Sequence, residues 1–473
     1  MLTSLEFLST GKSWPPTSEV ERLSLYSNNA KLFEGKHDQV FKDWVRLLRE
    51  DQQATLEIVL NWHRRLSTLW ADLLLGEPPR ISAGDRNTPE QQAVERLIRD
   101  NQLPNVAYEV VLDVSRFGTG LFKVRYDGRG IIEAQQPNVW FPVVKPDNVK
   151  EIVAHVLAWD YEVEERGLFG ARKNRYLKAE IHEPGKITSV LYALRNGAIA
   201  AEQQREEVST EVDDFLIVPV NNVLTTDRIT GLDDYSDLDS IIQELEVRAA
   251  QISRILDKHA DPNMYGPDTA LEQDAATGKW TFRGSGKYFP VGPDEEPPGY
   301  VTWDGQLEAA FKQIDLLIEQ LYILSETSAA AFGQLKSGLA ESGSALRRLM
   351  IAPLAKINRI RMRFDPAIKK ALRLASELEA AQGMPGAVRL ENIDIAWQDG
   401  LPQDEMEMAQ MYALLVQNGL VSRETALKHL FQFEADTLRD ELMKITAETN
   451  AQTPMIFKPN LGQGQGQQPG SGS

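Results

Sequence analysis

The chain has 473 residues, with 69 acidic against 51 basic residues, a formal net charge of −18 and no cysteine. This acidic excess repels nucleic acid at long range, which excludes tight, sequence-independent coating of DNA; it either keeps the chain soluble or lets DNA slide past without sticking. The lack of cysteine excludes disulfides and thiolate metal sites, and it suits assembly in a reducing cytoplasm.

The first part of the chain, 1–103, is predicted to be helical and rich in loops. The N-terminus lacks a basic segment followed by an apolar block, so we expect no signal peptide. The chain contains no run of 18 or more apolar residues, so we expect no membrane-spanning helix. Apolar residues recur at helical spacing around Tyr26–Phe33 and again in 40–48. A further amphipathic helix is predicted from about Ala54 to Leu75, where Gly76 and two prolines end it.

The middle of the chain is predicted to consist of strands. From Tyr108 to about Leu224, β-branched and aromatic residues alternate and are interrupted by glycines. The clearest candidates are Val153–Tyr161, Arg175–His182, Thr188–Leu194 and Phe215–Pro219. Because no helix-length crossovers separate them, they suit antiparallel meanders.

Two long amphipathic helices are predicted over 238–259 and 307–324. Asp234, Ser236 or Asp237 is a plausible N-cap for the first. The apolar stripes consist of Leu238, Ile241, Ile242, Leu245, Ile252, Leu256, Phe311, Ile314, Leu317 and Ile318. The β-rich insert between the helices carries the aromatic residues Trp280, Phe282, Tyr288, Phe289, Tyr300 and Trp303.

A long helix is predicted from Ser342 to Leu374, after a segment rich in small residues and glycine hinges. Proline lacks a backbone donor and clashes with the preceding turn, so we expect kinks at Pro353 and Pro366. The helix is strongly basic, because only Asp365 opposes its lysines and arginines between Ser344 and Arg373. These are Arg347, Arg348, Lys356, Arg359, Arg361, Arg363, Lys369, Lys370 and Arg373.

The C-terminal part is predicted to hold one strand, at 391–398, and helices at 406–417 and 422–431. Beyond about Ala451 the sequence is low in complexity and rich in Gly and Gln, which predicts a disordered tail.

No catalytic or cofactor motif assembles in this sequence. The six histidines are far apart and more typical of structural or surface positions than of a metal site. Gly11-Lys12-Ser13 lacks the preceding glycine of a phosphate-binding loop, and Gly118-Thr119-Gly120 lacks the third glycine of a dinucleotide fingerprint. Acidic pairs such as Asp213-Asp214, Asp233-Asp234 and Glu295-Glu296 could hold Mg²⁺, but solvated loops commonly carry such pairs. We therefore expect no enzyme activity, no cofactor and no metal.

Over nearly its whole length except the tail, the chain resembles the portal proteins of long-tailed double-stranded-DNA phages. Four passages carry the resemblance: Tyr26–Gly35 with Leu60–Ile81 and its Gly-x-Pro-Pro turn; the strand region from FGTGLFKVRYD to VPVNNV; the helix, aromatic insert and helix of 235–330; and Glu341–Ile357, which has the family's Ser-Gly-x-Ala-Leu start of a long kinked helix. No single passage is enough to identify the family, but the order of the four passages along the chain is specific to it.

The resemblance implies an α+β, predominantly helical portal fold that forms a ring, with wing, stem, clip and crown regions. By position these are an N-terminal wing region of helices then antiparallel strands (1–234), the first stem helix (235–261), the clip (262–304), the second stem helix (305–331), the tunnel loop (332–343), a long kinked wing helix and strand (344–401), the crown helices (402–450) and the tail (451–473). The stem stripes are then expected to pack against neighbouring copies around an open axis.

The resemblance further implies a homododecamer at one capsid vertex of the virion, assembled in the host cytoplasm, that passes double-stranded DNA and contacts no membrane. Its expected partners are the terminase large subunit, a head-tail adaptor and the major capsid protein, with a scaffolding protein as a further candidate. The residues expected to face DNA at the tunnel loop are Gln334, Lys336, Ser337, Arg347 and Arg348. The other basic residues of the long helix are expected to pair with acids of a neighbouring subunit, and the insert aromatics to form a local core or to anchor a docking partner.

Two other interpretations stay open at this point. One is a different virion head or adaptor protein, although adaptors are usually shorter and lack paired stem helices with an insert. The other is a metal-dependent DNA-processing enzyme that uses the acidic loops.

Overall fold

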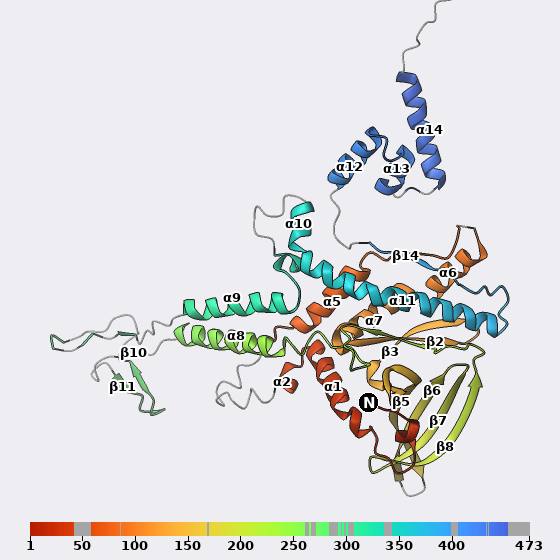
Figure 1. The fold of residues 1–473 in the computed structure, drawn as a ribbon. Helices are drawn as coiled ribbons and strands as arrows, with labels where there is room; N and C mark the ends of the chain where they lie inside the picture. The colour runs from red at the N-terminus through yellow and green to blue at the C-terminus, as the bar shows by residue number, and fades with distance from the viewer. Residues whose placement is uncertain are drawn as a thin grey trace, which may run out of the picture. The chain divides into compact units, whose positions relative to one another are not determined.

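A computed structural model describes most of the chain, which divides into two compact units (Figure 1). The described residues are 1–41, 58–85, 87–167, 170–260, 264–265, 271–282, 292–294, 296–297, 299–300, 307–334, 343–398, 405–431, 433 and 435–452. The first unit consists of Met1–Lys336 and Arg347–Gly400, and the second of Ser337–Leu346 and Leu401–Ser473. The expected combination of many helices with antiparallel sheets is confirmed. In the described part of the chain, no helix is long and apolar enough to cross a membrane.

The first unit opens with short 3₁₀ turns and a set of packed helices. These are η1 (Leu5–Leu8), η2 (Thr17–Glu19), α1 (Val20–Glu34), α2 (His37–Val40), α5 (Trp62–Leu75), α6 (Pro89–Asp100) and α7 (Leu103–Phe117). Helix α5 begins later than predicted, because Asn61 caps it by accepting a hydrogen bond from Arg64 N at 3.0 Å and 58–60 are not helical. The predicted start of that helix, 54–57, and most of the periodic segment 40–48 lie outside the described residues.

The prediction that strands begin at Tyr108 is wrong, because 108–117 form the second half of α7. Val110, Val114 and Phe117 follow helical spacing and are buried on one face, and this packing outweighs the strand preference of valine. The helix ends at Gly118, whose φ of 74° suits glycine. A Cβ there would lie 2.3 Å from the carbonyl oxygen of Gly231, so no other residue fits.

Two antiparallel sheets form the β part, as predicted. One has the order β4-β5-β6-β7-β8 and the other β3-β2-β9. The strands are β2 (Thr119–Tyr126), β3 (Gly130–Gln135), β4 (Trp140–Lys145), β5 (Asn148–Gly167), β6 (Gly170–Glu183), β7 (Lys186–Arg195), β8 (Ala198–Ser209) and β9 (Ile217–Asn221), with a 3₁₀ turn η3 at Pro137–Val139. Strand β8 was not predicted, because most of its side chains are polar and exposed and show no alternation.

The predicted long helix is present, but its break lies elsewhere. Helix α10 (Gly343–Leu349) and helix α11 (Ile351–Ala381) are separated at Met350, so Pro353 sits in the first turn of α11, where its missing N–H costs nothing. Pro366 lies inside α11. The helix continues past Leu374 because it covers the sheet of β2 and β3 (Figure 1), where the Glu379 carboxylate accepts a hydrogen bond from Gly130 N at 2.9 Å.

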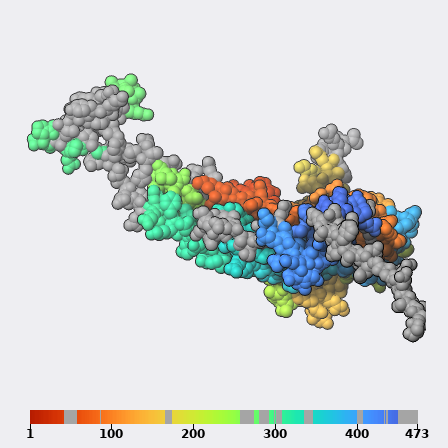
Figure 2. All heavy atoms as spheres, turned by 90° about the horizontal axis from the view of Figure 1, so that it is seen from above, coloured from red at the N-terminus to blue at the C-terminus, as the bar shows by residue number. Residues whose placement is uncertain are grey.

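Helices α8 (Asp239–Ala260) and α9 (Leu307–Leu324) occupy the two predicted amphipathic segments and lie side by side (Figures 1 and 2). A short 3₁₀ turn, η5 (Ala329–Phe332), follows α9. The described pieces of the insert are short antiparallel strands that pair as β10 with β13 and β11 with β12. They are β10 (Met264–Tyr265), β11 (Leu271–Gln273), β12 (Trp280–Phe282) and β13 (Gly299–Tyr300).

The remaining elements match the C-terminal predictions closely. The predicted strand 391–398 is β14 (Asp394–Ala396), which pairs with β1 (Arg80–Ser82). The second unit holds α12 (Glu405–Gln417), α13 (Arg423–Phe431) and α14 (Ala435–Gln452). Ser422 caps α13 by accepting a hydrogen bond from Thr425 N at 3.1 Å. Helix α14 was predicted only as part of 402–450, and the tail beyond Gln452 lies outside the described residues.

Candidate functional site at the root of the paired helices

The inner faces of α8 and α9 pack against each other and against α5. Leu238, Ile242 and Leu245 are at most 2% exposed there, together with Leu66 from α5 and Leu321 from α9. The partly buried residues around this cluster are Leu60, Trp62, Ile241, Ile314, Leu317, Ile318, Tyr322 and Phe332. The expectation that neighbouring copies cover these stripes is wrong for this face. The helices are neighbours within one chain, so their own stripes cover each other.

Three residues of the predicted stripes, Ile252, Leu256 and Phe311, lie outside this cluster. Leu256 in α8 is 50% exposed and Phe311 in α9 is 51% exposed, whereas Ile252 is buried. Leu256 lies near the C-terminal end of α8, far from Leu238. Phe311 lies near the N-terminal end of α9, far from Leu321. The intrachain cluster therefore covers the part of the pair near α5, which we call the root.

The outward face of α9 carries a second apolar set that the sequence analysis missed. Leu316 is 55% exposed, Ile323 is 66% exposed and the adjoining Leu324 is 51% exposed. Leu316 and Ile323 are seven residues apart, so they lie on the same side of the helix, away from Leu321. We call Leu316 and Ile323 the outer stripe; Leu324 lies three residues after Leu321 and is closer to the inner face. The seven-residue spacing of Leu316 and Ile323 could have indicated the outward face, but the more numerous apolar residues of the inner stripe dominate the pattern of the same helix. Large apolar side chains exposed on one helix face are typical of an interaction surface.

The chain enters α8 through a capped turn. Asp233 Oδ1 accepts hydrogen bonds from the backbone N of Tyr235 at 2.9 Å and of Ser236 at 2.8 Å. Burial raises the pKa of Asp233, and these hydrogen bonds oppose that rise. Asp233 therefore caps the turn that precedes α8, which begins at Asp239, and is not the N-cap of the helix itself. Asp234 is free for a different role.

Asp234 is the centre of a buried polar network that ties this turn to other elements. Its carboxylate accepts hydrogen bonds from Ser115 Oγ at 2.7 Å, Asn222 Nδ2 at 2.8 Å and Lys356 Nζ at 2.8 Å. The Lys356 side chain is only 5% exposed, and its ammonium lies 4.3 Å from the centre of the Trp70 ring. A buried ion pair with this many hydrogen bonds is costly to break, so it fixes the position at which α8 starts.

Two buried histidines hold the first turns of α8. His63 Nε2 lies 3.0 Å from Asp239 Oδ1, and His37 Nδ1 lies 2.6 Å from Glu246 Oε1. The two imidazole rings are 5.0 Å apart. Burial lowers the pKa of His63, although the hydrogen bond to Asp239 opposes this. The structural role expected for histidines agrees with this burial.

The residues predicted to face DNA are only partly described. Gln334 follows η5, and its side-chain oxygen accepts a hydrogen bond from Tyr322 OH at 3.4 Å. Arg347 and Arg348 lie on α10 and are exposed. Lys336 and Ser337 lie outside the described residues. Their common position at a channel therefore stays a prediction.

The aromatic residues of the insert likewise stay a prediction. Trp280, Phe282 and Tyr300 lie in the short strands β12 and β13, whose side-chain surroundings are outside the described part. Tyr288, Phe289 and Trp303 lie outside the described residues altogether.

The basic residues of α11 have contacts within the chain; the expected pairing with acids of a neighbouring subunit is wrong for Lys356, which is buried in its pair, and stays a prediction for the others. Lys370 and Arg373 both contact the carboxylate of Asp214, at 2.7 and 2.8 Å. Lys369 pairs with Asp365 on its own helix at 2.8 Å. The remaining partners are Asp234 for Lys356, Glu326 for Arg359, the Trp397 ring for Arg361 and the Asn221 carbonyl for Arg363.

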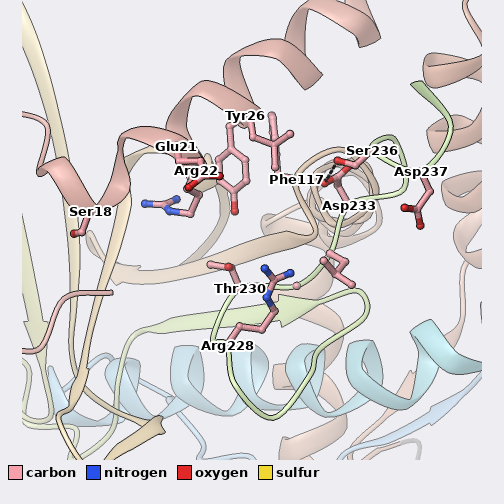
Figure 3. Close-up of a pocket in the computed structure, with 13 residues that line it drawn as sticks. Ser18, Glu21, Arg22, Tyr26, Phe117, Arg228, Thr230, Asp233, Ser236 and Asp237 are labelled. Carbon is pink, nitrogen blue, oxygen red and sulfur yellow. Dashed lines mark hydrogen bonds between the residues drawn. The ribbon is translucent and has the colours of Figure 1, made fainter. Parts of the chain in front are cut away.

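A cavity of about 360 Å³ lies between α1 and the loop that leads into α8 (Figure 3). Tyr26 points into it from α1, and Arg228 and Thr230 face it from the loop. The Arg22 guanidinium, in contrast, donates hydrogen bonds to Glu19 and to the carbonyl oxygen of Trp140. The lining mixes both charges, and Ser236 Oγ donates a hydrogen bond to Asp233 at 3.0 Å within the turn that leads into α8.

The acidic pairs considered as Mg²⁺ ligands do not form a metal site in the described part of the chain. No group of three or more histidine, aspartate or glutamate side chains could hold a metal ion there. Asp214 and Asp234 are neutralised by lysine and arginine, and Asp233 caps the turn that precedes α8.

Comparison with known proteins decides the family. The sequence model described as "Phage portal protein, SPP1 Gp6-like" matches residues 17–455. The chain belongs to the phage portal protein family. This is a structural family and not a family of enzymes. The match spans α8, α9 and the outer stripe.

Comparisons of this portal protein with curated proteins and with solved structures give weaker similarity. No curated protein matches it. Its fold is similar to a chain of the "Neck of empty GTA particle computed with C6 symmetry", with a TM-score of 0.48, 13% identity, and coverage of 89% of this chain and 96% of the other. A chain of the "Virion of native gene transfer agent (GTA) particle" gives a TM-score of 0.44, 14% identity and the same two coverages. A chain of the "Neck of native GTA particle computed with C12 symmetry" gives a TM-score of 0.39 and 15% identity, with coverage of 78% of this chain and 89% of the other.

Proposed function

We propose that this portal protein is the subunit of a homododecameric ring that surrounds a channel for double-stranded DNA at one vertex of a capsid. DNA would enter through the channel during packaging and leave through it during ejection. The observation that carries this proposal is the family match over residues 17–455. The ring would be part of the virion, after assembly in the host cytoplasm.

The outer stripe supports assembly with further copies. Leu316 and Ile323 are more than half exposed in the single chain, and apolar side chains on one helix face gain free energy when they are covered. In a ring, each copy uses one surface to contact the next copy and another surface to contact the previous one. We propose that the outer stripe is one of these two surfaces.

The regions of the chain receive their roles by position. We propose that α8 and α9 are the stem and that 262–304 is the clip, which docks the terminase large subunit first and a head-tail adaptor later. Helix α11 would cross the wing, and 402–450 would form the crown. The major capsid protein, with a scaffolding protein as a further candidate, would contact the outside of the ring.

The segment 332–343 would narrow the channel as a tunnel loop. Gln334, Lys336, Ser337, Arg347 and Arg348 would face DNA from it or from the start of α10. A channel must bind phosphates weakly at every register, because a deep minimum at one register would stall translocation. The net charge of −18 per chain suits this requirement, because the ring as a whole then repels the DNA backbone.

Electron microscopy of the purified protein in negative stain tests the proposal directly. We expect rings with a central hole, whose class averages show a single rotational symmetry. A protein that stays monomeric or dimeric at high concentration would contradict it.

A further inference from the structure

A second cavity, of about 420 Å³, lies in the first unit between β5, the segment that enters β9, and α11. Its apolar wall consists of Ile152, Phe215, Ile217, Val218, Pro219, Pro366 and Ala367. Its polar lining consists of Lys150, His155, Arg363 and Lys370, with Glu151 as the one acid. Donors and positive charge from two separate elements, β5 and α11, therefore converge on one open space.

The charge balance of this cavity is positive although the chain as a whole is acidic. Glu151 is already paired with Lys145. Lys370 shares the carboxylate of Asp214 with Arg373, which also lies 3.7 Å from Glu377. Among the described residues, Lys150 donates hydrogen bonds to the backbone carbonyl oxygens of Thr225 and, at 2.6 Å, of Arg228. These acceptors are neutral, although the Asp227 carboxylate of the same loop interacts with the Lys150 charge.

Arg363 offers the largest number of unused donors. Its one hydrogen bond among the described residues runs from Nη1 to the carbonyl oxygen of Asn221 at 3.5 Å, which is long. A guanidinium has five N–H donors in a fixed fork. Most of the fork is thus available to a ligand in the cavity.

His155 adds a buried donor from the opposite wall. Its side chain is 2% exposed, and Nδ1 accepts a hydrogen bond from Trp140 Nε1 at 3.0 Å. Burial, with smaller contributions from His182 and Lys370, lowers the pKa of His155 to about 3, so the ring is neutral at physiological pH. A neutral imidazole that accepts at Nδ1 carries its proton at Nε2. That N–H has no hydrogen-bond partner in the described part of the chain.

We propose that this cavity binds a phosphate group. A carboxylate has two oxygens and cannot use all the donors that Arg363, Lys370, Lys150 and His155 present, whereas a phosphate has more oxygens and more charge. The apolar wall leaves room for an organic body attached to the phosphate. The phosphate is either free in solution or part of a DNA backbone. The site does not depend on the ring, because all of its residues come from one chain.

Equilibrium dialysis of the full-length protein against radiolabelled inorganic phosphate tests this proposal. We expect saturable binding of one phosphate per chain. Arg363→Gln should weaken it about tenfold or more, because a charge-assisted hydrogen bond is lost. Arg363→Lys should recover part of the affinity. Lys369→Gln, which removes the same charge from α11 but outside the cavity, should leave the affinity within about twofold.

Competition identifies the source and the selectivity. If a short DNA duplex displaces phosphate, the natural ligand is a DNA backbone; if it does not, the ligand is a free phosphate compound. Acetate at equal ionic strength should not compete. The proposal is overturned if wild-type protein binds no phosphate saturably, if Arg363→Gln binds it as well as Lys369→Gln, or if acetate competes equally. None of these results depends on whether the protein forms rings.

Discussion

At the root, Leu238, Ile242 and Leu245 are at most 2% exposed, whereas on the outer stripe Leu316 and Ile323 are 55% and 66% exposed. Both sets are aliphatic, and both lie on the same pair of helices. The root is also crossed by buried polar contacts, which tie α8 to α5, α7 and α11 through Asp234 and His63. The outer stripe has only aliphatic side chains to offer. One face of the pair therefore holds the fold together, and we propose that the other is left for contacts between chains.

The sharpest test of this division is a charge placed in the root. Leu245→Asp puts a carboxylate into the cluster of α8, α9 and α5, where no partner is available in the described part of the chain. We expect it to lower the free energy of unfolding by several kcal/mol, because a buried unpaired charge is strongly disfavoured. Denaturant-induced unfolding, followed by circular dichroism, measures the change.

Leu256→Asp is the matched control for this substitution. It makes the same change on the same helix at a position that is 50% exposed. We expect a change within about 0.5 kcal/mol, as for most surface substitutions. Equal destabilisation by the two variants would show that the cluster does not hold the helix pair.

The next largest effect should come from the buried ion pair. Lys356→Met leaves the Asp234 carboxylate without its cation in a site that is 9% exposed. We expect a loss of about 3 kcal/mol, since removing one partner of a buried pair leaves the other charge unpaired. Chemical denaturation measures this loss, and Lys369→Met, whose pair with Asp365 is partly exposed, should cost about 0.5 kcal/mol.

The double variant Lys356→Met with Asp234→Asn separates the ion pair from packing. Removing both charges should restore much of the stability, because no unpaired charge remains. A double variant that is as unstable as the sum of the two single variants would show that Lys356 acts through its contact with Trp70 instead.

Much of this arrangement could be predicted from periodicity and turn residues. The spacing of Leu238 to Leu256 and of Leu307 to Leu321 predicted both long helices, and the lack of crossovers predicted antiparallel sheets. The helix α7 was mistaken for a strand, because valines and a phenylalanine satisfy a strand pattern as well as a helix pattern over a short run. Only its packing against α5 decides between them.

What covers each apolar stripe could not be predicted in the same way. Periodicity shows that one face of a helix is apolar, but not whether the partner is α5 of the same chain or another copy. Asp234 and Lys356, likewise, are far apart in the sequence, so the surplus of basic residues on α11 gave no indication of its intrachain partners. The buried network at the root depends on these long-range contacts and therefore had no local signal.

The stability of the root should also depend on pH. Burial lowers the pKa of His63, so the folded chain binds a proton there less readily than the unfolded chain, in which the side chain titrates near pH 6.5. Below that pH the unfolded state binds more protons, so the free energy of unfolding falls as the pH falls from about 7, by at most about 1.4 kcal/mol per pH unit for this group. His63→Gln should reduce the slope between pH 7 and about 5.

His429→Gln is the control, because His429 is exposed on α13 and stacks on Tyr412. Its slope should equal that of the wild type. If His63→Gln also leaves the slope unchanged, His63 takes up its proton in the folded chain and the root tolerates the charge.

The smallest effect on folding, and the largest on assembly, is expected at the outer stripe. Ile323→Asp changes a residue that is 66% exposed, so the free energy of unfolding of the single chain should stay within about 0.5 kcal/mol. If a neighbouring copy covers this residue in a ring, the same substitution buries a carboxylate at each contact and prevents ring formation. Mass photometry measures the number of copies in each assembly. Val208→Asp is the matched control, because it places the same charge at an exposed valine of β8. Intact rings from Ile323→Asp would show that the outer stripe does not contact a neighbouring copy. If only this variant stays a folded monomer, one face of α9 serves folding and the opposite face serves assembly.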